Sequence, residues 1–152
     1  MPDHAEVPFA QPPDHVMWRP EVAAVVADEA ARTYPAECCG LLLGTADGEV
    51  VAAEPIANGE SGDRLPVAYL LSPGAYRQAE ERARAAGLEV VGVFHSHPDH
   101  PAEPSPTDLA DAWPGWLYVS VPVEAGRPGL ARGWRLQPDR SGFAPVDLIH
   151  IA

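Results

Sequence analysis

The sequence predicts an α/β fold built around one central sheet, and three observations predict it. Two segments have apolar or alanine-rich residues at helical spacing and end at a proline or a glycine. Short apolar and β-branched runs, which favour strands, lie between and after these segments. The chain has 152 residues, 46% of them hydrophobic, which is enough for one domain with a buried core. We therefore expect a single-domain sandwich in which helices flank a central mixed sheet.

Three segments are expected to be helical. Residues 21–34 carry valines at helical spacing, and Pro35 ends the run. Residues 74–86 follow a Ser-Pro pair, which supplies an N-cap and a proline at the first helical position, and they stop at Gly87. A second Ser-Pro pair predicts a short helix over residues 105–112.

The rest of the chain is expected to form an N-terminal arm and strands. Residues 1–19 carry four prolines and little apolar periodicity, so we expect an extended or flexible arm there and the domain over residues 20–152. Residues 88–94 are nearly all apolar and β-branched, which is typical of a strand covered on both faces. The other expected strands are 39–43, 49–55, 67–71, 116–123, 130–137 and 146–151.

Charge and composition exclude several kinds of partner. The net charge of -12 repels phosphate backbones, so nucleic acid is not an expected ligand. No apolar stretch is long enough to span a bilayer, and the N-terminus lacks the pattern of a secretory signal, so no membrane contact is expected. The two cysteines, Cys38 and Cys39, are adjacent and cannot staple a fold. We interpret them as a sign of a reducing, cytoplasmic location.

Two histidines at the end of the buried strand predict a metal site. His95 and His97 are two positions apart, so both imidazoles point to the same face. Asp108, in the first turn of the short helix, is a candidate third ligand. Two histidines and one aspartate leave a fourth position open for water, which is typical of a catalytic zinc site.

Two more residues are candidates for the chemistry at that site. Glu37 precedes the strand 39–43, whose anchored end can hold the carboxylate as a proton acceptor. Ser105, close to Asp108 in sequence, can offer its hydroxyl to a developing oxyanion.

The spacing of these residues resembles the signature of the JAMM/MPN+ family of zinc metallopeptidases: a distant Glu, then His-x-His-Pro, seven residues and Ser-x-x-Asp. Seven residues separate His97 from Ser105, and two separate Ser105 from Asp108. Residues 37–44, Glu-Cys-Cys-Gly-Leu-Leu-Leu-Gly, resemble the Glu-x-Cys-Gly-Leu-Leu-x-Gly strand of the short bacterial members. The resemblance covers about residues 20–125.

The resemblance implies a cytidine-deaminase-like sandwich and hydrolysis of the bond after the C-terminal Gly-Gly of a ubiquitin-like protein. It implies that His95, His97 and Asp108 bind Zn²⁺, that Glu37 is the general base and that Ser105 stabilises the tetrahedral intermediate. The chain's size is similar to that of the Mec+-like bacterial branch, which processes ubiquitin-like sulfur-carrier proteins. The expected partner is therefore a sulfur carrier ending in Gly-Gly, from which a C-terminal amino acid such as cysteine is released.

Structural interpretations compete with several of these assignments. Ser105-x-x-Asp108 is also a capping box. Cys38 and Cys39 fit buried strand positions as well as a place near the metal, and His100 fits a solvated loop as well as a substrate contact. Two tryptophans either pack in the core or wall the site, and four arginines form either a docking face or solvated hairpin positions. These residues are Trp113, Trp116, Arg127, Arg132, Arg135 and Arg140.

Other functions are weighed against the peptidase. A non-catalytic MPN scaffold that binds protein partners would usually lack a metal ligand, whereas the full set is present here. A relative of the RadC group would continue His-Pro-Ser-Gly, whereas this chain continues Pro98-Asp99-His100. A deaminase is disfavoured because the chain has no Pro-Cys-x-x-Cys. Exposed strands make a homodimer a further possibility.

Overall fold

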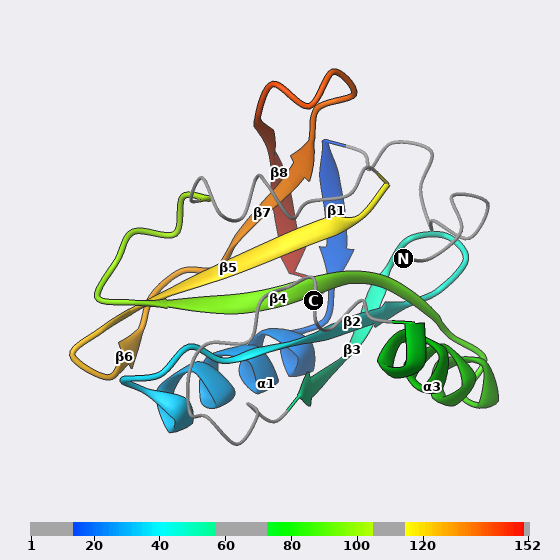
Figure 1. Ribbon diagram of the computed structural model, residues 1–152, viewed down its shortest axis with the longest axis horizontal. Helices are drawn as coiled ribbons and strands as arrows, with labels where there is room; N and C mark the ends of the chain where they lie inside the picture. The colour runs from blue at the N-terminus through cyan, green and yellow to red at the C-terminus, as the bar shows by residue number, and fades with distance from the viewer. Residues whose placement is uncertain (1–13, 57–72, 105–114, 151–152) are drawn as a thin grey trace.

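The computed structural model describes residues 14–56, 73–104 and 115–150, and Figure 1 shows how their elements are arranged. Within these ranges the chain forms eight strands and two helices. Neither helix is long and apolar enough to cross a bilayer. The elements are β1 (His15–Trp18), α1 (Pro20–Thr33), β2 (Cys39–Gly44), β3 (Val50–Ile56), α3 (Pro73–Ala85), β4 (Glu89–Pro98), β5 (Leu117–Glu124), β6 (Arg127–Pro128), β7 (Arg132–Leu136) and β8 (Phe143–His150).

The eight strands form one mixed sheet that closes on itself. Its order is β4-β2-β3-β1-β8-β7-β5-β6, and β4 also pairs with β5. The pairs β4–β5, β1–β8 and β1–β3 are parallel, and the others are antiparallel. Strand β4 consequently has a hydrogen-bonded neighbour on each side, which accounts for its nearly continuous apolar sequence.

Each helix belongs to a different apolar cluster. Helix α1 buries Val22, Val26 and Ala30 in a cluster that includes residues of β1, β2, β4, β5 and β8. Helix α3 buries Ala79 and Ala83 in a second cluster, made largely by β2, β4, β5 and β7. The prediction of a single α/β domain with a mixed sheet and flanking helices is confirmed. The closer comparison with cytidine deaminases stays a prediction.

The predicted N-terminal arm ends earlier than residue 19. Residues 15–18 form β1, which pairs in parallel with β8 and, at Trp18, with β3. Val16 and Trp18 are 3% and 1% exposed and belong to the core. The strand escaped sequence analysis because it has only four residues and prolines flank it on both sides. Residues 1–13 lie outside the described part of the chain.

Most predicted elements agree with the structure to within a few residues. The helices predicted at 21–34 and 74–86 are observed as α1 and α3, each shifted by one residue. Strand β4 runs through Pro98, so the histidine pair lies inside a paired strand. The hairpin strand β6 was not predicted. The strand predicted at 67–71 and the helix predicted at 105–112 lie outside the described residues.

Candidate metal centre

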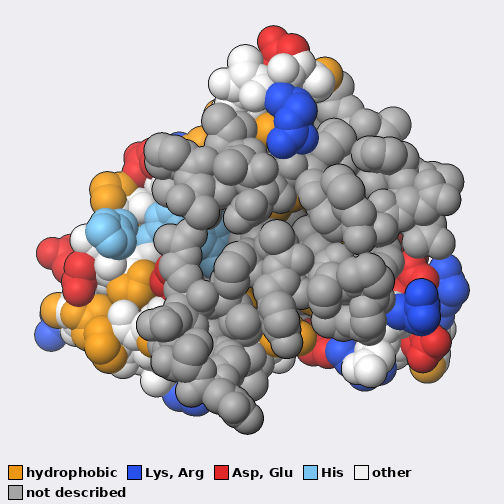
Figure 2. All heavy atoms as spheres, viewed as in Figure 1, with side chains coloured by type: hydrophobic (Ala, Val, Ile, Leu, Met, Phe, Trp, Pro, Cys, Tyr) orange, Lys and Arg blue, Asp and Glu red, His pale blue; other side chains and the backbone are white. Residues whose placement is uncertain are grey.

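The two histidines of β4 converge on one point. His95 pairs with Cys39 of β2 on one side and with Ser120 of β5 on the other. The Nε2 atoms of His95 and His97 are 2.8 Å apart, and their ring centroids are 4.8 Å apart. Their exposed fractions are 8% and 7%, so both rings are buried apart from a small opening. Figure 2 shows histidine side chains gathered at one place on this face, with acidic and hydrophobic side chains beside them.

This pair fits a zinc site. Two nitrogens on a tetrahedral zinc, at about 2.0–2.1 Å from the metal, would lie about 3.3 Å from each other. The observed 2.8 Å needs only a small rotation of the rings to reach that separation. The Nδ1 atom of His97 contacts the carbonyl oxygen of Pro101 at 2.6 Å. A metal-bound histidine commonly donates its other ring N–H to such a carbonyl, which leaves Nε2 as the ligand atom.

The remaining predicted ligand is beyond what the structure describes. Asp108 lies outside the described residues, as does Ser105. Within the described ranges no group of three His, Cys, Asp or Glu side chains is arranged for a metal ion. The structure therefore brings together two of the three predicted ligands, and the assignment of Asp108 and Ser105 stays a prediction.

The segment that leads to Ser105 is anchored on the sheet. After the His97 contact to Pro101, the Ser120 hydroxyl of β5 donates a hydrogen bond to the carbonyl of Ala102. The indole N–H of Trp134 donates to the same hydroxyl at 3.0 Å, and all three groups are buried. The chain is thus fixed against β5 up to three residues before Ser105.

Glu37 comes two residues before β2, the strand that pairs with the histidine-bearing end of β4. Cys39 is opposite His95 in the antiparallel β2–β4 pair. The N–H of Ser96 donates to the carbonyl of Cys38 at 3.1 Å, so the pairing continues toward residue 37. Continued by one more step, this register places Glu37 opposite His97, and opposite residues share a sheet face. We therefore expect the half-buried Glu37 on the face that carries both histidines.

Cys38 and Cys39 are buried at 2% and 3% exposure, as the structural interpretation predicted, with Cys39 the first residue of β2 and Cys38 just before it. Burial raises the pKa of the Cys38 thiol, although hydrogen bonds from Ser96 and Thr33 act in the opposite direction. Burial, reinforced by neighbouring negative charges, raises the pKa of the Cys39 thiol to about 12. For both thiols burial is the largest effect, so the reactive thiolate form is disfavoured.

Neither cysteine is expected to react with iodoacetamide at pH 8 while the chain is folded, because the thiolate is the nucleophile and both pKa values are raised. Intact-mass spectrometry should show no adduct on the native chain and two adducts after alkylation in denaturant. An adduct on the native chain within minutes would show that one thiol is accessible and ionised.

Asp99, at the start of the loop that follows β4, forms a polar clamp with Tyr34 and Ala125 that the sequence did not indicate. Asp99 has a φ of 57°, in the left-handed region. Its carboxylate accepts hydrogen bonds from the Tyr34 hydroxyl at 2.8 Å and from the Ala125 N–H at 3.1 Å. Both hydrogen bonds lower the pKa of the Asp99 carboxyl, the one from the Ala125 N–H more than the one from the Tyr34 hydroxyl. The bond between Tyr34 and Asp99 also raises the pKa of the Tyr34 hydroxyl. No local signal in the sequence indicated the partner Tyr34, 65 residues away.

Replacing Tyr34 by Phe is expected to lower stability at pH 8 and to matter less in alkali. The pKa of the Tyr34 hydroxyl is higher in the folded chain than in the unfolded chain. The hydrogen bond therefore stabilises the fold fully when the pH is below the unfolded-state pKa, and this stabilisation is lost as the pH rises through the folded-state pKa. Urea unfolding at a series of pH values should therefore show a wild-type advantage that narrows above about pH 10. A pH-independent difference would contradict the clamp.

The other residues singled out in the sequence have structural environments. His100 is exposed in the loop after β4, and Trp116 is fully buried in the α3 cluster. Arg132 contacts Glu103 at 3.3 Å and stacks on the Trp134 ring. Arg135 pairs with Asp14, whereas Arg127 and Arg140 are exposed. Trp113 lies outside the described residues.

Comparison with known proteins assigns the chain to a family. A family model described as prokaryotic homologs of the JAB domain matches residues 19–137. The chain is 39% identical over 103 residues to a desampylase of Haloferax volcanii, covering 66% of this chain and 73% of that protein. It is 36% identical over 81 residues to a probable TtuB-protein conjugate cleaving protease of Thermus thermophilus, covering 53% of this chain and 52% of that protein.

Solved structures have the same fold. A protein from Salinibacter ruber matches with a TM-score of 0.69 at 43% identity, covering 89% of this chain and 91% of that one. A JAB1/MPN domain protein from Archaeoglobus fulgidus matches with a TM-score of 0.56 at 17% identity, covering 89% and 98%. A JAMM protein described by its metalloprotease-like zinc site matches with a TM-score of 0.53 at 20% identity, covering 91% and 98%. The chain therefore belongs to the JAMM/MPN family, in its prokaryotic JAB-domain group.

Proposed function

We propose that this chain is a zinc-dependent isopeptidase that hydrolyses the amide bond after the C-terminal Gly-Gly of a ubiquitin-like protein. The observation that carries the proposal is the convergence of the His95 and His97 Nε2 atoms, 2.8 Å apart, on a strand paired with β2, which Glu37 precedes. The relatives named desampylase and TtuB-protein conjugate cleaving protease support the substrate class.

In the proposed mechanism His95, His97 and Asp108 would hold a zinc ion. When bound, zinc supplies a Lewis acid that polarises a carbonyl and makes water more acidic. Glu37 accepts the proton of the attacking water and returns it to the leaving amine. The Ser105 hydroxyl donates a hydrogen bond to the oxygen that becomes negative in the tetrahedral intermediate. The contact between His97 and Pro101 holds one imidazole in orientation throughout.

The substrate's tail must be thin and extended to reach nitrogens that are less than a tenth exposed. Gly-Gly meets this requirement because neither residue has a side chain. A strand of the domain would hold such a tail through its backbone by strand addition. We propose the narrower assignment, release of a C-terminal amino acid such as cysteine from a sulfur carrier, as one form of the same reaction.

The test is cleavage followed by intact-mass spectrometry. One substrate is a Gly-Gly ubiquitin-like protein joined to a lysine side chain, and the other is the same protein extended by a C-terminal cysteine. Each is incubated with the zinc-loaded protein, the chelator-treated protein and the Glu37→Gln variant. We expect cleavage only by the zinc-loaded wild type.

The pattern of cleavage selects between the assignments. Cleavage of the lysine conjugate alone supports an isopeptidase and removes the sulfur-carrier assignment. Loss of the terminal cysteine supports that assignment. A wild type that binds zinc but cleaves neither substrate would favour the RadC-like alternative. A wild type that binds no zinc would favour the non-catalytic scaffold.

A further inference from the structure

We propose that Ser96, the residue between the two histidines, is a positioning residue that sets the place of Glu37 relative to them. This inference rests on the proposed function. Neighbouring residues of a strand point in alternate directions, so the Ser96 side chain lies on the opposite face of β4 from the two imidazoles. Ser96 is 0% exposed, so its hydroxyl faces the interior instead of the substrate.

Ser96 joins β4 to residue 38 by two hydrogen bonds. Its backbone N–H donates to the carbonyl of Cys38 at 3.1 Å, and its hydroxyl accepts the N–H of Cys38 at 2.8 Å. A regular antiparallel pair would return the second bond to the backbone carbonyl of residue 96. Here the side chain takes that role, so residue 38 is held at a position that an alanine at residue 96 would not specify.

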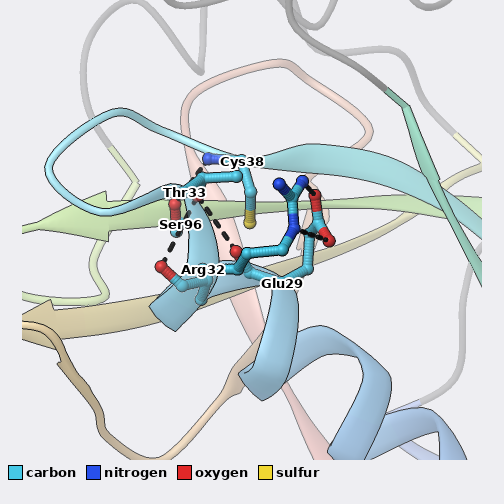
Figure 3. A network of polar contacts seen from close by, with 6 residues as sticks. Glu29, Arg32, Thr33, Cys38 and Ser96 are labelled. Atoms are coloured by element: carbon cyan, nitrogen blue, oxygen red, sulfur yellow. Dashed lines mark hydrogen bonds and ion pairs between the residues drawn. The ribbon is translucent and has the colours of Figure 1, made fainter.

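The same serine faces a network from the end of α1, shown in Figure 3. The Thr33 hydroxyl donates to the carbonyl of Glu29 at 3.0 Å, and Arg32 forms an ion pair with the Glu29 carboxylate. The hydroxyls of Ser96 and Thr33 both act on the Cys38 thiol, whose pKa they lower against the larger effect of burial. The backbone of Cys38 is thus held by Ser96 next to the end of α1.

Glu37 is the next residue after this anchored point toward the N-terminus. The Cys38 N–H lies in the planar peptide unit that includes the Cα of Glu37, so its bond to the Ser96 hydroxyl fixes the point from which the Glu37 side chain starts. A proton acceptor must lie within hydrogen-bond distance of its proton, and a displacement of about 1 Å can lower a rate about 100-fold. Loss of the hydroxyl should therefore affect turnover more than substrate binding.

The test compares Ser96→Ala and Ser96→Thr with a matched control. Thr45 follows the other end of β2, and its hydroxyl accepts a hydrogen bond from the backbone N–H of Glu49. Thr45→Ala therefore removes the same kind of hydrogen bond far from the histidines. For Ser96→Ala we expect kcat to fall about 10- to 100-fold, with KM within about twofold and zinc content unchanged. Ser96→Thr keeps the hydroxyl and should return kcat to within about threefold of wild type. Thr45→Ala should leave kcat unchanged.

Amide hydrogen exchange of the Cys38 N–H gives a readout independent of activity. It should accelerate in Ser96→Ala and return to the wild-type rate in Ser96→Thr. Unchanged exchange, an unchanged kcat in Ser96→Ala or an equal loss of kcat in Thr45→Ala would each overturn the proposal. If the wild type cleaves no substrate, the proposed function fails, and accelerated exchange confined to residues 37 and 38 would still support the anchoring by Ser96.

Discussion

Replacing Glu37 by Gln is expected to lower kcat for cleavage of a ubiquitin-like conjugate by about 10²- to 10⁴-fold while zinc binding is kept. Glutamine has nearly the same shape, so the register of β2 against β4 should persist. It cannot accept the proton of the attacking water, and that is the step assigned to Glu37. The measurement is single-turnover cleavage by the zinc-loaded variant, with zinc determined on the same sample.

Glu89→Gln is the matched control for Glu37→Gln. Glu89 is an exposed carboxylate at the first position of β4, at the opposite end of that strand from the histidines. It pairs with Gly44, the last residue of β2, whereas Glu37 precedes the first residue of that strand. The control should retain wild-type kcat. Full activity in Glu37→Gln would show that another group is the base.

Replacing Gly92 by Ala is expected to destabilise the fold by about 3 kcal/mol or more, or to prevent folding. A Cβ at residue 92 would lie 2.1 Å from the carbonyl oxygen of Leu117, a backbone atom that cannot move aside alone. Gly92 is directly opposite Leu117 in the parallel β4–β5 pair. The substitution would therefore force apart the two strands whose pairing closes the sheet.

Urea unfolding followed by circular dichroism measures this effect, and Gly142→Ala provides the control. A Cβ at Gly142 would meet nothing within 4 Å, so that variant should differ from wild type by less than about 0.5 kcal/mol. If Gly92→Ala unfolds at the wild-type urea concentration, the close contact of β4 with β5 is not present in solution.

The local elements were largely predictable, whereas the closure of the sheet was not. Valine spacing and Pro35 located α1 to within one residue, and the apolar run before His95 located β4. The parallel pairing of β4 with β5 and of β1 with β8 brings together segments that are distant in sequence. No local pattern encodes which strands become neighbours, so β1 and the two-residue β6 were missed.

The chemistry of the site was more predictable than its supports. The His-x-His spacing placed two imidazoles on one face, and the structure brings their nitrogens together. The support by Ser96 depends on a hydrogen bond to a residue 58 positions away. Such contacts follow from the register of β2 against β4, which only the folded chain defines.

Zinc content tests the central claim most directly. Wild type, a His95→Ala/His97→Ala double variant and His100→Ala are loaded with excess zinc, dialysed and analysed by mass spectrometry of the metal. His100 is exposed in the loop after β4 and serves as the histidine control. We expect about one zinc per chain in wild type and in His100→Ala, and less than about a tenth of that in the double variant. Zinc retained by the double variant, or absent from the wild type, would contradict the assignment of His95 and His97 as ligands.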